Sequence, residues 1–134
     1  MMTLPSHETV YSEVYFNLHK KVFSVRALEG ENKGKVIAHM NTVLVELPKF
    51  VVQEGGRQRV IREKRKNVHA FVRGQVLLRY SRAGLPDLDE MIEVTYNPYK
   101  YDSFVTKNSN IPVKRASLAL LTGKKVFTTR DAIV

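Results

Sequence analysis

The chain has 134 residues, of which 43% are hydrophobic and 26% are charged, and these proportions allow one compact domain with its own core. It contains no cysteine, which excludes a disulfide framework and a cysteine-ligated zinc site. Its 22 Lys and Arg residues outnumber 13 Asp and Glu residues, for a formal net charge of +9, so the composition favours an anionic partner. We expect neither a secretory signal nor a membrane span, because no apolar segment is long enough for either.

The first part of the chain predicts strands separated by short turns. Residues 1–10 are expected to form a loose leader. Val14, Phe16 and Leu18 then recur at every second position, which places them on one face of a strand. Gly30 and Gly34 mark a turn, and Pro48 marks an edge or a bend. Strands are expected at residues 13–18, 22–28, 35–40, 43–52, 68–80, 91–96, 102–107, 116–121 and 125–129.

One helix is expected in the middle of the chain. Gly55 and Gly56 interrupt the strand pattern, and residues 57–66 are rich in good helix formers. Val60 and Ile61 would anchor this helix, and Asn67 would end it. The sequence therefore predicts an α+β fold, with a mostly antiparallel sheet and one short basic helix, in a single domain over residues 1–134.

The positive charge is concentrated between residues 57 and 73. Seven cations lie there against one carboxylate, Glu63, so the segment contributes +6 of the net +9. In a helix, Arg59, Arg62 and Lys66 would share one face, and guanidinium groups match phosphate oxygens two at a time. The seven cations are Arg57, Arg59, Arg62, Lys64, Arg65, Lys66 and Arg73.

The strand after this helix would present His69, Phe71 and Arg73 on one side. An aromatic ring beside cationic groups can hold a nucleobase while its phosphate is neutralised. The alternatives are a solvated basic helix, a core role for Phe71 and a structural role for His69.

A second candidate cluster is the tyrosine-rich stretch 96–101, where Asn97 and Tyr99 could contact a base or a ribose. The alternative is a loop whose rings pack over the sheet. Arg115 belongs to a weaker basic pair. The candidate ligand-binding residues are Arg57, Arg59, Arg62, Arg65, Lys66, Asn67, His69, Phe71, Arg73, Asn97, Tyr99 and Arg115.

The sequence does not favour an enzyme. The histidines are scattered without metal-ligand spacing, and no nucleophile motif is present. The carboxylates between Asp87 and Glu93 could hold a nuclease metal, but a solvent-facing acidic loop is the simpler interpretation. We therefore expect no catalytic residue, no metal and no cofactor.

The central run Gly56–Val72, together with Val14–Leu18 and Val94–Tyr99, resembles a widespread group of small bacteriophage proteins. Within that group it is similar to the first Thoeris anti-defence family. This resemblance implies a protein that sequesters a cyclic ADP-ribose signal, or a cyclic oligonucleotide, without cleaving it. It also implies a homo-oligomer in the cytoplasm of the infected bacterium. The site residues above come from charge and periodicity, not from the family.

Two other functions remain open. The same arginines could follow a phosphate backbone, which would make the protein a small basic nucleic-acid-binding protein of phage origin. It could also be an inhibitor that docks on an acidic host protein, or a minor virion component.

Overall fold

The structure is a computed structural model that describes residues 9–79 and 85–133. The expected leader therefore lies mostly outside the described residues, as do the last residue of the strand expected at 68–80 and the four residues after it. The last two residues of the expected leader are not loose, because strand β1 already begins at Thr9.

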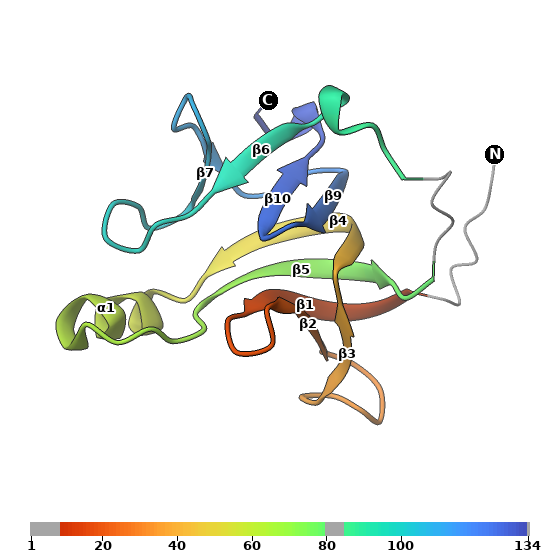
Figure 1. Ribbon diagram of the computed structural model, residues 1–134, viewed down its shortest axis with the longest axis horizontal. Coiled ribbons are helices and arrows are strands. Elements are labelled where there is room, and N and C mark those ends of the chain that lie inside the picture. Colours follow the sequence, from red (N-terminus) through yellow and green to blue (C-terminus); the bar gives the residue numbers. More distant parts are fainter. Residues whose placement is uncertain (1–8, 80–84, 134) are drawn as a thin grey trace.

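Ten strands form one sheet, in which every neighbouring pair is antiparallel, so the α+β expectation is confirmed (Figure 1). The strand order is β3-β2-β1-β5-β4-β9-β10-β6-β7-β8. The strands are β1 (Thr9–Asn17), β2 (Val22–Ala27), β3 (Val36–Met40), β4 (Thr42–Val52), β5 (Ala70–Leu77), β6 (Ile92–Thr95), β7 (Phe104–Thr106), β8 (Pro112–Val113), β9 (Leu118–Thr122) and β10 (Lys125–Thr128). The helices are α1 (Glu54–Glu63) and the short 3-10 helices η3 (Leu88–Glu90) and η4 (Arg130–Ile133).

The alternation of the sequence places one face of the sheet in the core. One row of four buried residues crosses the neighbouring strands in register. It consists of Val25 on β2, Val14 on β1, Val72 on β5 and Phe50 on β4. Burial of such side chains stabilises the fold by about 1.5–3 kcal/mol each. Leu18 was expected on the same face, but it follows the end of β1 and is 59% exposed.

The second half of the sheet closes on itself. β8 and β9 belong to one run of chain, which lies along β4 from the Thr42–Thr122 pair to the Lys49–Arg115 bridge. β9 pairs with β10, β10 with β6, β6 with β7, and β7 with β8. This series of pairs therefore begins and ends on the same run of chain. Figure 1 shows β6, β7, β9 and β10 on one side of β4, and β1, β2, β3 and β5 on the other.

The bend predicted at Pro48 is present in β4. The register of its pairing with β5 shifts between Glu46 and Lys49, and Leu47 has a φ of 51°. This bulge lets β4 continue along both neighbours without breaking. The turn expected at residues 41 and 42 is shorter than predicted, because Thr42 already pairs with Thr122.

The helix begins earlier than the sequence predicts. α1 spans Glu54–Glu63 and includes both glycines, and it ends at Lys64, whose φ is 58°. The expected stop at Asn67 is therefore wrong, because the left-handed residue that terminates the helix is Lys64. Val60 is the buried anchor, as expected. Gly56 packs so closely that a Cβ there would lie 2.6 Å from Cβ of His69.

Candidate functional site

A groove of about 810 Å³ lies where α1, the end of β1 and the loop after β6 meet. Its volume falls within the range of pockets that hold small organic ligands. Much of its lining is aromatic or aliphatic, and five polar residues interrupt that surface. The lining residues are Tyr15, Phe16, Asn17, Leu18, Val60, Lys66, Asn67, Val68, His69, Ala70, Tyr96, Asn97, Pro98 and Tyr99.

A buried histidine organises the polar part of this groove. His69 is 6% exposed, and its Nδ1 lies 3.2 Å from the carbonyl oxygen of Asn67 and 3.0 Å from the Asn67 side-chain oxygen. Because both neighbours are acceptors, Nδ1 carries the proton of the neutral ring and Nε2 is the acceptor. The Tyr96 hydroxyl donates to that Nε2 at 2.6 Å. Burial raises the pKa of Tyr96 to about 12, so this donor stays protonated well into the alkaline range.

The loop after β6 forms the opposite wall. The side-chain oxygen of Asn97 accepts from the backbone N–H of Tyr99 at 2.9 Å, which fixes a tight turn. Tyr99 is 56% exposed, and the Lys64 ammonium lies 5.9 Å from the centre of its ring. An aromatic face and Lys64 therefore meet at this wall, and Lys66 lines the same groove.

Arg57 joins the helix to this wall. Its Nε donates to the carbonyl oxygens of Pro98 and Tyr101, at 3.0 and 2.8 Å, and its Nη1 pairs with Glu54 at 2.9 Å. Arg57 was expected to contact a ligand. Its guanidinium instead holds the loop that forms one side of the groove.

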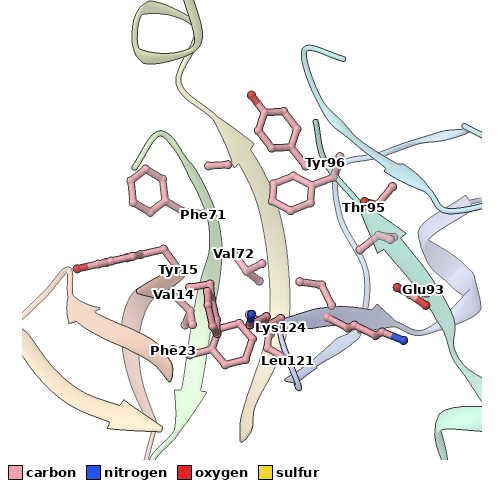
Figure 2. A pocket seen from close by; sticks show the side chains of 16 residues that line it. Val14, Tyr15, Phe23, Phe71, Val72, Glu93, Thr95, Tyr96, Leu121 and Lys124 are labelled. Atoms are coloured by element: carbon pink, nitrogen blue, oxygen red, sulfur yellow. The ribbon is translucent and has the colours of Figure 1, made fainter. Parts of the chain in front are cut away.

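A smaller cavity of about 260 Å³ continues from this groove between the two halves of the sheet. The two share Tyr15, Phe16, Ala70 and Tyr96 as lining residues. Figure 2 shows Tyr15, Phe71 and Val72 on one side of it, and Tyr96, Thr95 and Glu93 on the other.

The structure brings together only part of the predicted site. Five of the predicted residues line the larger groove: Lys66, Asn67, His69, Asn97 and Tyr99. Three further predicted residues on or near α1 are exposed and are not among its lining residues. These are Arg59, Arg62 and Arg65.

The expectation that His69, Phe71 and Arg73 share one side holds for Phe71 and Arg73, because the Arg73 guanidinium carbon lies 5.9 Å from the centre of the Phe71 ring, whereas His69 precedes the strand. β5 begins only at Ala70, and His69 turns towards Tyr96. Phe71 is 2% exposed and contacts Tyr15, while Arg73 pairs with Glu13 at 3.0 Å. Arg115 is exposed and lies beside Lys49, away from the groove lining.

Sequence reasoning missed the contribution of β1 to the groove. Tyr15 and Phe16 were treated as ordinary strand residues, yet both line it. Tyr96 was assigned to a packing loop, and its ring does stack on Phe104 with centroids 5.5 Å apart. A single sequence carries no signal for these placements, because they depend on a sheet that brings β1 beside β5 and α1 beside the loop after β6.

The acidic stretch is not one loop, because Asp89 and Glu90 lie in η3 and Glu93 lies on β6. Asp87 accepts from the backbone N–H of Asp89 at 3.0 Å, and Glu93 pairs with Lys107 at 3.5 Å. Over residues 9–79 and 85–133, no group of three or more His, Asp or Glu side chains has metal-site geometry. Within the same ranges, no helix is both long and apolar enough to cross a bilayer.

The model of the Mycobacterium phage L5 gene 82 protein family matches residues 5–129. The chain belongs to this family. The gene 82 protein of Mycobacterium phage L5 itself is 39% identical over 119 residues, which cover 84% of this chain and 90% of that protein. The match extends from the first strand to the last one, so the groove residues of this member of the gene 82 family all lie within it. No solved structure matches the chain significantly.

Proposed function

We propose that this member of the gene 82 family binds and sequesters an anionic nucleotide signal without cleaving it. The observation that carries the proposal is the larger groove, with its aromatic walls, amide groups and one lysine, Lys66, around one volume of about 810 Å³. Such a mixture suits a nucleotide, because rings stack on bases, amides bond base edges or ribose, and cations neutralise phosphate.

The roles follow from the groove geometry. Tyr99 offers an exposed ring for a base, and Asn67, whose side-chain oxygen is bound by His69, offers its amide nitrogen. Asn17 shapes the groove wall instead, because its amide bonds to Ser24, His19 and Lys20. Lys66 supplies charge for a phosphate group at the rim. His69 is committed to Asn67 and Tyr96, so it positions the wall and is not assigned to proton transfer.

Retention without turnover is part of the same proposal. The groups at the groove suit recognition, whereas hydrolysis would require an activated nucleophile or a metal-bound water. The first ligand class to test is cyclic ADP-ribose, followed by cyclic oligonucleotides. A homo-oligomeric assembly and a location in the cytoplasm of the infected host complete the proposal.

Mass spectrometry of the protein purified natively from infected cells, with cells lacking the signal as control, tests the proposal. Heating the protein is expected to release an intact cyclic nucleotide. Release of a hydrolysed product would contradict sequestration, and failure of purified protein to bind any cyclic nucleotide would contradict the function.

A further inference from the structure

A row of charged residues crosses the sheet on the face opposite the core. Arg26 on β2 is the register partner of Glu13 on β1, which is also opposite Arg73 on β5. Arg73 is also the register partner of Lys49 on β4. The backbone of Lys49 in turn forms a β-bridge with Arg115. We call these five residues the basic row; it has four cations and one carboxylate, a net +3. Because neighbouring strands lie about 4.8 Å apart, the row spans about 19 Å.

The adjacent row shows why these side chains face outward. The row members on β2, β1, β5 and β4 each have a core residue as a neighbour in sequence. These core residues are Val25, Val14, Val72 and Phe50. Side chains alternate along a strand, so the basic row lies on the other face. Lys49 and Arg115 are exposed.

Glu13 holds Arg26 and Arg73 in position, and its single negative charge does not neutralise both of their positive charges. Its side chain is 5% exposed and accepts from Arg26 on one side and from Arg73, at 3.0 Å, on the other. The side chains of Arg26 and Arg73 stay 33% and 30% exposed. Their guanidinium carbons lie 5.6 and 5.9 Å from the centre of the Phe71 ring. Each guanidinium has five N–H donors, so pairing with Glu13 leaves donors for an external anion.

The shape of this surface favours a polymer over a small ion. A single phosphate would contact one or two of these cations, whereas a phosphate backbone can follow a line of about 19 Å across a sheet. Tyr15 lies beside Arg26, whose guanidinium carbon is 5.6 Å from its ring centre, and an aromatic next to a basic line suits unpaired bases. We propose that the basic row binds the phosphate backbone of single-stranded nucleic acid. The five residues of the basic row are not among the lining residues of the groove, although Tyr15 borders both surfaces.

The test compares two variants that lose the same charge. K49A/R115A removes the two exposed cations of the row, and K33A/K35A removes two exposed lysines from the turn between β2 and β3. Fluorescence anisotropy with a ~20-nucleotide single-stranded DNA, from about 50 to 200 mM salt, gives affinity and its salt dependence. Thermal melting of each variant verifies that it is folded.

The row predicts a specific change in salt dependence. Each lost phosphate contact makes the slope of log affinity against log salt concentration less steep by about 0.7. At ~0.1 M salt, the loss of one contact therefore weakens binding about five-fold. K49A/R115A is therefore expected to bind about 25-fold more weakly, with a slope smaller by about 1.4, while K33A/K35A stays close to wild type. Equal effects of the two variants, or loss of binding only on replacing Arg59 and Arg62, would overturn the proposal. Equal binding to polyglutamate would also overturn it, in favour of an acidic protein partner.

Discussion

Two adjacent glycines at the start of α1 have different surroundings. A Cβ on Gly56 would lie 2.6 Å from Cβ of His69, whereas one on Gly55 would meet no atom within 4 Å. Gly56→Ala must displace the helix from the start of β5, and we expect a loss of about 1–3 kcal/mol in unfolding free energy. Gly55→Ala gains helix propensity and is expected to stabilise the protein by about 0.5–1 kcal/mol. Urea denaturation of both variants checks this, and equal effects would contradict it.

The Tyr96 hydroxyl gives the protein a pH dependence in the alkaline range. Its pKa is raised by burial from 10.0 to about 12 in the folded state, so the unfolded chain loses this proton first. The stability that this group contributes is therefore complete below pH 10 and is lost as pH rises towards 12. Ultraviolet titration should show one late-titrating tyrosine that is missing in Tyr96→Phe, and a late step that persists in the variant would refute the assignment.

The same substitution affects stability at neutral pH. Tyr96→Phe removes the donor that lies 2.6 Å from Nε2 of His69 and leaves a buried acceptor without a partner. We expect a cost of about 1–3 kcal/mol in unfolding free energy. Tyr99→Phe, at a side chain that is 56% exposed, is the matched control and should stay within about 0.5 kcal/mol of wild type.

At the scale of elements, Arg57 connects α1 to the loop after β6. Arg57→Ala removes both bonds to the carbonyl oxygens of Pro98 and Tyr101. We expect a loss of about 1–3 kcal/mol in unfolding free energy and faster hydrogen exchange in residues 97–101. Arg59→Ala removes an exposed side chain from the same helix and should change neither quantity. Unaltered exchange in Arg57→Ala would mean that the loop holds its position without the helix.

Strands were the part of the fold that sequence could predict. Alternation of apolar residues located the strands around Val14, Val25 and Val45, although three consecutive residues are buried in each of these strands. The helix was shifted by several residues because Gly55 and Gly56 were taken as a break. Their low helix propensity is outweighed by the close packing that Gly56 allows against His69.

The candidate site was less predictable than the strands. Lys66, Asn67 and His69 were found from local charge and periodicity, and all three line the groove. Arg57 and Phe71 were assigned to a ligand, but protein contacts occupy them. Pairings such as Glu13 with Arg73, 60 residues apart, follow from strand order, which local periodicity does not encode.

At the scale of the whole molecule, two anion-binding surfaces are proposed on one sheet. The groove is lined by the end of β1, by Val60 of α1 and by the loop after β6, and the basic row crosses β2, β1, β5 and β4. The closed ladder of β8, β9, β10, β6 and β7 supports the groove because β6 leads directly into its loop wall.

Calorimetric titration with cyclic ADP-ribose tests the central claim, that the groove is the nucleotide site. Val68 lines the groove and is 48% exposed, so Val68→Trp fills the groove without removing a polar contact. Val36→Trp, at a position 42% exposed on β3, is the matched control. Wild type and Val36→Trp are expected to bind equally, and Val68→Trp at least about ten-fold more weakly, a difference of about 1.4 kcal/mol. Unchanged binding by Val68→Trp would contradict the account.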